Sequence, residues 1–247
     1  MRLLGEWLES NSRKSGSRIV LAADVGGPYA TRLERASSLV ASLSARVVAV
    51  KLNWHLLLPF GVLGLRELVE RCSDAGLPLI ADMKLNDIGA TNVEAAETLF
   101  SNGFDALIAN PFVGYEEGMR DVMQRSREMR KGVLLLVYMS HRGAREGYGL
   151  KAGNQPLYLR FARETRRWRA DGAIVSSKSP SIIREVRSIL RREQVILSPG
   201  VGTQGGDARK AIGAGSDYVI VGRSITEAKD PGRSADALNS ELRAEGE

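Results

Sequence analysis

The chain has 247 residues, of which 43% are hydrophobic and 26% are charged. These proportions are typical of a globular protein and exclude a disordered chain, a collagen-like repeat and a coiled coil. The formal net charge of +6 at pH 7 fits nucleic acid, a membrane surface or an anionic small molecule as a partner, and does not choose among them.

Neither a membrane segment nor a disulfide framework is expected. No run approaches the roughly 18 to 20 consecutive apolar residues that span a bilayer. Glu6 and Glu9 fall where a signal peptide needs an unbroken apolar core. The single cysteine, Cys72, excludes a disulfide within the chain and suggests a reducing, cytoplasmic location. With one Cys and two His, no soft-metal site is expected, whereas an oxygen-ligated Mg²⁺ site stays open.

Short apolar runs rich in β-branched residues recur along the chain and predict strands. In chain order they cover Arg18–Asp24, Val47–Lys51, Leu79–Lys84, Ala106–Asn110, Val133–Tyr138, Ala173–Val175, Val195–Ser198 and Tyr218–Val221. Most of these runs are continuously apolar rather than alternating. They are therefore typical of parallel strands that are buried on both faces.

Segments with helical spacing separate the predicted strands. After a short N-terminal helix they lie at Arg32–Ser44, Leu63–Cys72, Val93–Phe100, Glu116–Arg130, Gln155–Trp168, Ser181–Arg192, Ala208–Ala214 and Ala235–Arg243. The N-terminal helix covers Leu3–Ser10. Alternation of strand and helix through eight units predicts an α/β fold, a (β/α)₈ TIM barrel, and a doubly wound open sheet is the alternative. No linker divides the chain, so we expect a single domain over residues 1–247.

Charged residues gather at the ends of two neighbouring predicted strands, where such a barrel carries its chemistry. Asp82 and Lys84 are two residues apart, so they share one face of their strand. Lys51 ends the preceding strand and Asp87 lies in the following loop. An ammonium group between carboxylates stays protonated, because nearby opposite charge favours the charged form. A structural salt-bridge network is the alternative, although burying these charges without use is costly.

The glycine-rich segment Ser198–Asp207 is a second candidate site. Gly200, Gly202 and Gly205 have the spacing of a dinucleotide fingerprint. That fingerprint requires an acidic residue about 20 positions later, whereas this chain has Arg223 in that region. Glycine-rich turns after the last two strands match the phosphate site of barrels instead, where backbone N–H groups, a helix start and an arginine bind the anion. Plain turn residues are the other interpretation.

These residues resemble the orotidine 5′-phosphate decarboxylase family, particularly its shorter archaeal-type members. The similarity covers nearly the whole chain and rests on Leu21–Asp24, Val50-Lys51, Ala81–Asn92, Met139–Ala144, Leu197–Asp207 and Val221–Ile225. The Asp-x-Lys-x-x-Asp core is specific to a small suprafamily, and its combination with Lys51 and the glycine-rich segment favours the decarboxylase itself. The resemblance implies a lyase that converts orotidine 5′-phosphate to uridine 5′-phosphate in pyrimidine biosynthesis, with no cofactor and no metal.

The resemblance also implies roles for individual residues. Lys51, Asp82, Lys84 and Asp87 would form a charged catalytic array, in which Lys84 protonates C6 of the pyrimidine and Asp82 lies beside the departing carboxylate. Asp24 and Lys51 would contact the ribose hydroxyls. The remaining substrate-binding residues would read the pyrimidine amide edge (Ser140) or form the lid and phosphate grip: Pro199, Gly200, Val201, Gly202, Gln204, Gly222 and Arg223.

A homodimer is implied as well, because in the family the residues that match Asp87, Ile88 and Thr91 enter the partner's site. The chain departs from the family pattern at Gly89 and at Arg142, where proline is common, and both departures concern the rigidity of loops beside the site.

Two other functions compete with this interpretation. Metal-dependent sugar-phosphate enzymes of the same suprafamily, such as 3-hexulose-6-phosphate synthase, hold Mg²⁺ around the same core, but they carry an acidic residue where this chain has Lys51. A nucleic-acid-binding protein would also explain the positive charge. The arginines, however, are spread over predicted helices, and no nucleic-acid motif or interleaved aromatic residues accompany them. We therefore expect neither nucleic acid nor a membrane as a partner.

Overall fold

The computed structural model describes residues 3–243, and their parallel strands close into a barrel in the order β1-β10-β9-β8-β5-β4-β3-β2. The barrel strands are β1 (Ile19–Ala22), β2 (Ala49–Asn53), β3 (Leu79–Leu85), β4 (Ala106–Ala109), β5 (Gly132–Tyr138), β8 (Gly172–Val175), β9 (Val195–Pro199) and β10 (Tyr218–Val221). All of their pairings are parallel. The predicted (β/α)₈ barrel is thus confirmed, and the open sheet is excluded. The single domain stays a prediction.

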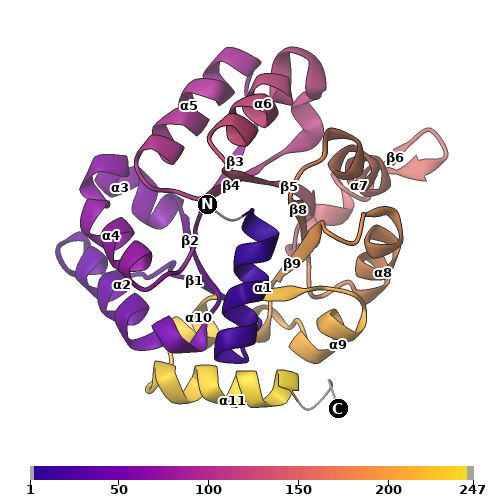
Figure 1. Cartoon of the computed structure of the whole chain (residues 1–247). Coiled ribbons are helices and arrows are strands. Elements are labelled where there is room, and N and C mark those ends of the chain that lie inside the picture. Colours follow the sequence, from indigo (N-terminus) through magenta and orange to yellow (C-terminus); the bar gives the residue numbers. More distant parts are fainter. Residues whose placement is uncertain (1–2, 244–247) are drawn as a thin grey trace.

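Helices surround the barrel (Figure 1). They are α1 (Leu4–Ser15), α2 (Tyr29–Leu43), α3 (Trp54–Gly64), α4 (Arg66–Asp74), α5 (Gly89–Ser101), α6 (Arg120–Glu128), α7 (Leu157–Trp168), α8 (Pro180–Ile189), α9 (Ala208–Gly213), α10 (Arg223–Thr226) and α11 (Pro231–Arg243). No helix within residues 3–243 is long and apolar enough to cross a membrane.

The sheet is buried on both faces, as its continuous apolar runs predict. Side chains that alternate along each strand divide between two apolar clusters. Leu21, Val50 and Leu107 point outward and pack under the helices. Val20, Ala49 and Ile108 point inward and fill the barrel.

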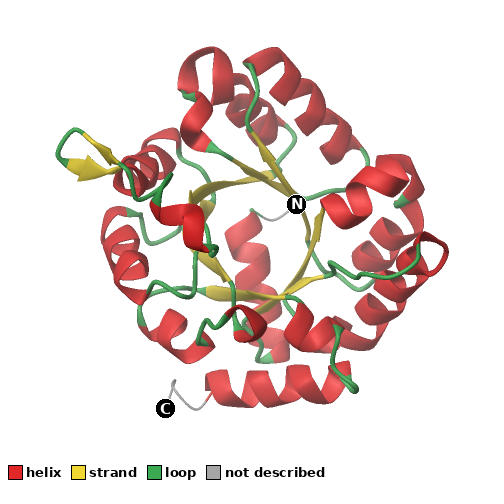
Figure 2. Cartoon of the chain, turned by 180° about the vertical axis from the view of Figure 1, so that it is seen from behind, coloured by secondary structure: helices red, strands yellow, loops and turns green. Residues whose placement is uncertain are grey.

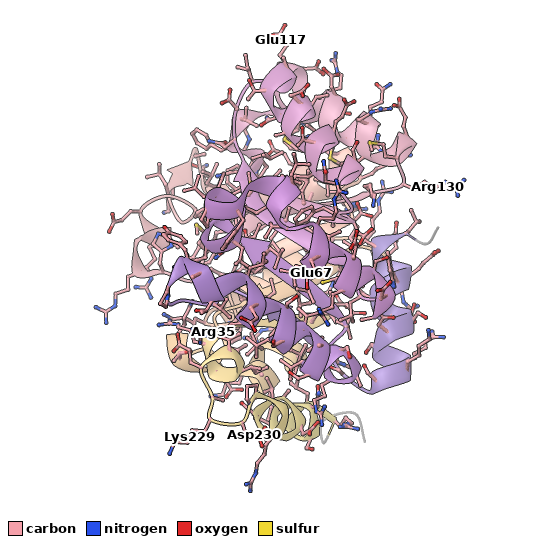
Figure 3. The ribbon with its side chains drawn as sticks, turned by 90° about the vertical axis from the view of Figure 1, so that its left-hand side faces the viewer. Arg35, Glu67, Glu117, Arg130, Lys229 and Asp230 are labelled. Carbon is pink, nitrogen blue, oxygen red and sulfur yellow. The ribbon has the colours of Figure 1, made fainter. Side chains whose placement is uncertain are left out.

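Helix α1 closes the end of the barrel at which the strands begin. Its Leu4 and Leu8 are buried and belong to the inner apolar cluster. Figure 1 shows α1 lying across this end, and Figure 2 looks into the other end, which is ringed by the loops that follow the strands. Charged side chains such as Glu117, Arg130 and Lys229 point outward from the periphery (Figure 3), so much of the charge is on the surface.

Several predicted boundaries differ from the structure. The predicted helix Glu116–Arg130 begins only at Arg120, because Glu117 has a positive φ of 53° that interrupts regular helix. A helix over Trp54–Gly64, kinked near Pro59 and Gly61, was not predicted. The two-residue strands β6 (Lys151–Ala152) and β7 (Gln155–Pro156) form a small hairpin outside the barrel.

Candidate active site

The alternation of side chains along β2 and β3 places the charged residues inside the barrel. Ala49 and Ile80 belong to the inner apolar cluster. Lys51 and Asp82 follow them by two residues each, so their side chains face the same interior at the carboxyl end of the sheet. Lys51 is 4% exposed and Asp82 is 9% exposed. Two buried charges therefore lie directly above an apolar core.

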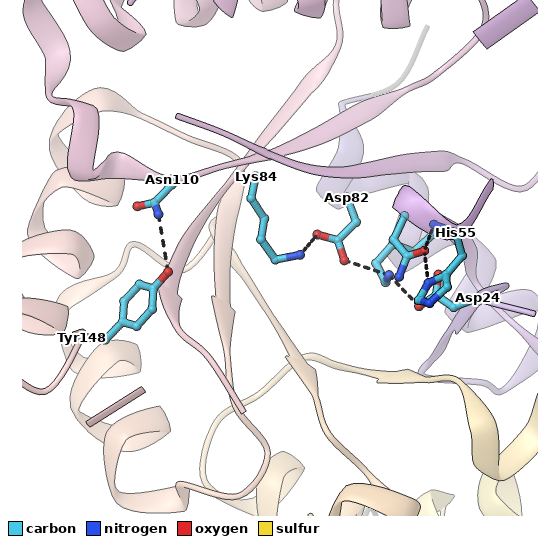
Figure 4. A network of polar contacts seen from close by, with 8 residues as sticks. Asp24, His55, Asp82, Lys84, Asn110 and Tyr148 are labelled. Carbon is cyan, nitrogen blue, oxygen red and sulfur yellow. Dashed lines mark hydrogen bonds and ion pairs between the residues drawn. The ribbon is translucent and has the colours of Figure 1, made fainter. Parts of the chain in front are cut away.

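Four charged side chains form a continuous network at this place (Figure 4). Lys51 Nζ donates to Asp24 Oδ2 at 3.2 Å and to Asp82 Oδ2 at 2.8 Å. Lys84 Nζ donates to the other oxygen of Asp82, Oδ1, at 2.7 Å. Two ammonium groups and two carboxylates alternate, so the network is neutral as a whole, and Lys84 forms its end.

The network also fixes the charged states of its buried members. Burial disfavours the charged form of Asp82, but the Lys51 and Lys84 ammonium groups outweigh this effect and hold the pKa of Asp82 below its usual range. Burial likewise opposes charge on Lys51, but Asp24 and Asp82 prevail and raise its pKa above the usual value. Both groups are therefore charged at neutral pH.

The backbone at Lys84 departs from regular strand geometry. Lys84 has a φ of 51°, in the left-handed region that residues other than glycine rarely occupy. The pairing of β3 with β4 shifts register between Ala81 and Leu85, so the strand bulges where the lysine stands. Bulges redirect side chains next to active sites, and this one keeps Lys84 beside Asp82.

The network lines one side of a cavity of about 500 Å³ at the mouth of the barrel. This volume is within the range typical of small-molecule sites. The cavity has both polar and apolar walls. Its apolar floor includes Ile108, Leu136, Ile174 and Ile220, which point inward from four strands. The other predicted site residues that line it are Ser140, Pro199, Gly200, Val201, Gln204, Gly222 and Arg223, whereas Gly202 is not among its lining residues.

The glycine-rich segment folds back on itself at the rim of this cavity. The N–H of Gly206 donates to the carbonyl of Gly200 at 2.9 Å, and the N–H of Gly202 donates to the carbonyl of Gly206 at 3.0 Å. Gly200 has a φ of 100° and Gly202 a φ of 71°, a conformation that favours glycine. A Cβ at position 202 would also lie 2.0 Å from Ser224 Oγ. Glycine is thus required here by both conformation and space.

A hydrogen bond links this segment to the loop after β5. Ser140 Oγ donates to Gln204 Oε1 at 2.7 Å. Because both residues line the cavity, the contact closes one side of the mouth. It leaves the amide nitrogen of Gln204 available to a ligand.

Asp87, Ile88 and Thr91 do not line the cavity of their own chain. All three are exposed, and Ile88 has 66% of its surface accessible. Asp87 Oδ1 accepts from the N–H of Ile88 at 2.7 Å, and Asn92 Nδ2 donates to the Asp87 carbonyl at 2.6 Å. These contacts hold the chain at the start of α5.

Comparison with known proteins identifies the family of the chain. Residues 17–238 match the model of the orotidine 5′-phosphate decarboxylase / HUMPS family. The orotidine 5′-phosphate decarboxylase of Pyrococcus abyssi is 37% identical over 227 residues, which are 92% of this chain and 100% of that protein. This chain belongs to the orotidine 5′-phosphate decarboxylase / HUMPS family. The resemblance inferred from the motifs is therefore confirmed.

Solved structures of the family have the same fold. The crystal structure of orotidine 5′-phosphate decarboxylase from Pyrococcus horikoshii matches with a TM-score of 0.76 and 36% identity, over 91% of this chain and 99% of that one. The enzyme from Methanocaldococcus jannaschii, complexed with the inhibitor BMP, matches with a TM-score of 0.79 and 28% identity, over 92% and 98% of the two chains. The relatives are carboxy-lyases, so the prediction of a decarboxylase is confirmed at the level of the family.

Of the two departures from the family pattern, Gly89 was expected in a loop but is the first residue of helix α5. A Cβ at Gly89 would approach the carbonyl oxygen of Glu117 to 2.8 Å, so the loop before α6 leaves room only for glycine. Arg142 begins a 3₁₀ turn, Arg142–Arg145, in the segment after β5.

Sequence reasoning missed several residues of the cavity. The inward-pointing Ile108, Leu136 and Ile174 were interpreted only as parts of strands, although alternation from the strand ends identifies them. Asn53, the last residue of β2, and His55, near the start of α3, also line the cavity. Asn53 Oδ1 accepts from the backbone N–H of His55 at 2.9 Å and lies 2.8 Å from its Nδ1. No group of three potential metal-binding His, Cys, Asp or Glu side chains occurs within residues 3–243.

Proposed function

We propose that this chain decarboxylates orotidine 5′-phosphate to uridine 5′-phosphate, without a cofactor, in pyrimidine biosynthesis. The observation that carries the proposal is the position of Lys84. Its ammonium group is 2.7 Å from a carboxylate oxygen of Asp82 and lines the same cavity as the glycine-rich segment and Arg223. The cation for the reaction centre, Lys84, and the residues for binding a remote phosphate, Arg223 and the glycine-rich segment, thus line one cavity.

Lys84 would stabilise and then protonate the reacting carbon. When the bond between C6 and the carboxyl carbon breaks, CO₂ leaves and the electron pair remains on C6. A fixed ammonium group aimed at this developing charge stabilises it without reorganisation. Transfer of a proton from Lys84 to C6 completes uridine 5′-phosphate, and the neutral lysine regains a proton from solvent. The chemistry needs no external electron acceptor.

Asp82 would lie beside the substrate carboxylate. Because its pKa is held low, it would remain an anion, repel the carboxylate and anchor Lys84 at the same time. The apolar floor formed by Ile108, Leu136 and Ile174 would receive the neutral CO₂ as it forms.

Asp24 and Lys51 would bind the ribose. Asp24 Oδ2 accepts from Lys51, whereas Asp24 Oδ1 is buried and has no hydrogen-bond partner within residues 3–243. A buried acceptor of this kind is costly unless a donor reaches it, and a sugar hydroxyl supplies one. Lys51 would also maintain the order of the charges by bridging Asp24 and Asp82.

Phosphate would bind at the opposite side of the cavity. Backbone N–H groups of the glycine-rich segment and the start of α10 would approach the oxygens, and Arg223 would form a charged pair with them. Pro199, Gly200, Val201, Gln204 and Gly222, which line the cavity, would complete the lid and the phosphate site together with Gly202. Ser140, which also lines the cavity, would contact the pyrimidine amide edge. Binding energy from this remote group can be used at the reacting carbon.

A homodimer with shared sites completes the proposal. Asp87, Ile88 and Thr91 are exposed beside the mouth-forming strand β3. A second copy would bring its Asp87 to the end of the Lys-Asp network as a further carboxylate. Such an arrangement explains why three motif residues lie outside their own cavity.

The metal-dependent branch of the family is disfavoured by Lys51. Its ammonium group is within 3.2 Å of both carboxylates that a cation would need, and it would repel the metal.

A direct assay tests the function. Purified protein is mixed with orotidine 5′-phosphate in the presence of EDTA, and the loss of substrate absorbance is followed together with release of CO₂. Turnover that is unaffected by EDTA is expected. No turnover, or activity that appears only on adding Mg²⁺, would contradict the proposal.

A further inference from the structure

A second concave site lies beside the proposed active site and has no part in the proposed reaction. It has a volume of about 320 Å³. It is formed by Tyr138 at the end of β5 and by residues 139–142 and Arg145 after it, together with Ser176, Lys178 and Ser179 after β8. We call it the basic side pocket. It shares only Met139 and Ser140 with the larger cavity, so the two are neighbours separated by one wall.

The basic side pocket collects positive charge without counter-charge. Arg142, Arg145 and Lys178 line it, and no Asp or Glu is among its lining residues. No hydrogen bond or ion pair within residues 3–243 engages these three side chains. Like charges gathered in one concavity repel one another, and a bound anion relieves that repulsion.

A buried donor points to the same kind of ligand. Ser176 lines the pocket and is 1% exposed. Its Oγ accepts from the backbone N–H of Lys178 at 3.2 Å, but its hydroxyl proton has no acceptor within residues 3–243. A buried hydroxyl normally finds an acceptor, and an anion in the pocket would provide one.

From these observations we infer that the basic side pocket binds a phosphate-type oxyanion, of about diphosphate size. The volume is roughly that of ten water molecules, at about 30 Å³ each, which exceeds what a single water or chloride needs. Arginine matches the oxygens of phosphate groups by paired N–H donors, and Lys178 and Ser176 add donors from the other wall. Because Met139 and Ser140 form the shared wall, the bound anion would lie directly behind the residue proposed to read the pyrimidine.

Calorimetric titration with inorganic pyrophosphate tests the inference at constant ionic strength. The wild type is expected to bind two pyrophosphates per chain, one at the Arg223 grip and one in the basic side pocket. Arg223→Ala should retain only the side-pocket event. The double variant Arg145→Ala/Lys178→Ala should retain only the binding event at Arg223, because loss of two charged donors weakens binding in the side pocket by at least about tenfold.

The double variant Arg184→Ala/Arg192→Ala is the matched control. It removes the same charge from exposed positions in and just after α8, outside the pocket, and should bind like the wild type. One pyrophosphate per chain in the wild type, lost in Arg223→Ala, would overturn the inference. So would equal binding by the two double variants.

Adenosine diphosphate in the same titration identifies the source of the anion. If the pocket recognises the diphosphate group alone, both probes bind it with similar affinity. Markedly tighter binding of adenosine diphosphate, again lost in Arg145→Ala/Lys178→Ala, would assign the pocket to a nucleotide.

Discussion

Lys84 Nζ and Asp82 Oδ1 lie 2.7 Å apart, and the two residues are separated by one position on strand β3. The contact accompanies a bulge in which Lys84 has a φ of 51°. A left-handed conformation costs a residue with a side chain about 1–2 kcal/mol, so the surrounding structure must hold it. Strain of this kind is concentrated at functional sites, and it supports the role proposed for Lys84.

Replacing Lys84 by alanine should abolish turnover and leave the fold intact. The loss removes both the stabilising cation and the proton donor, so we expect kcat to fall by at least about 10³-fold. Loss of orotidine 5′-phosphate absorbance measures the rate, and circular dichroism checks folding. Near-normal activity in a folded Lys84→Ala variant would refute the assignment.

Replacing Arg223 by alanine should act through the phosphate. Loss of a charged hydrogen-bonding pair is expected to lower kcat/KM for orotidine 5′-phosphate by about 10- to 100-fold. The control substrate is orotidine, which lacks the phosphate and should be turned over equally slowly by variant and wild type. A similar loss with both substrates would mean that Arg223 does not act through the phosphate.

Mixing two inactive variants tests whether the sites are shared. Lys84→Ala and Asp87→Ala should each be inactive alone. If Asp87 serves the partner's site, a mixed dimer has one site with both residues intact, and random reassortment should restore about a quarter of wild-type activity. The mixture is denatured, refolded together and assayed, with each variant refolded alone as a control. Absence of recovery would indicate that each site is self-contained.

The charged network should make stability depend on pH at both extremes. The lowered pKa of Asp82 means that its contribution is present above the pKa of the unfolded carboxyl, about 4, and is lost as pH falls through the lower folded value. The raised pKa of Lys51 means that its contribution is present below about 10.4 and is lost as pH rises through the higher folded value.

Urea unfolding at pH 7 and pH 3 measures how much stability the protein loses at low pH, where the contribution of Asp82 is lost. The free energy of unfolding of Asp82→Asn should fall less between these pH values than that of the wild type. Glu70→Gln, which removes an exposed carboxylate on α4, is the control and should follow the wild type. Equal pH dependence of Asp82→Asn and wild type would show that Asp82 does not contribute in this way.

Leu8→Ala should destabilise the protein without affecting catalysis. Leu8 is fully buried against the inner apolar cluster, and leucine-to-alanine changes of this kind cost about 3–5 kcal/mol. Since α1 closes the end of the barrel away from the cavity, kcat at a temperature where the variant is folded should be unchanged. Leu3→Ala, at a position with 61% exposure, is the control. A loss of activity in folded Leu8→Ala would mean that packing of α1 affects the active-site cavity at the other end of the barrel.

Periodicity predicted the barrel because its signals are local and repeated. Lys51 and Asp82 could be placed together from strand alternation alone, since their strands are neighbours in sequence. The bulge at Lys84 could not be predicted in this way, because it depends on how β3 pairs with β4. Regular alternation nevertheless put Lys84 on the correct face.

Elements without strong periodicity escaped prediction. Helix α3 contains Pro59 and Gly61, both of which normally interrupt helices. The hairpin of β6 and β7 has only two residues in each strand, too few for any alternation to be visible. The apolar floor of the cavity was missed for another reason: Ile108 and Leu136 lie within continuous apolar runs, where only counting alternate positions from the strand ends separates inward-pointing from outward-pointing residues.

The position of α1 has a consequence for attaching the protein to a surface. Lys14 is exposed on this helix, at the end of the barrel opposite the mouth. The chain's single cysteine, Cys72, is buried, and burial raises the pKa of its thiol to about 12. A Lys14→Cys variant would therefore present one reactive thiol to a maleimide support. The immobilised molecules would then share one orientation, in which the mouth of the barrel and its cavity face the solution.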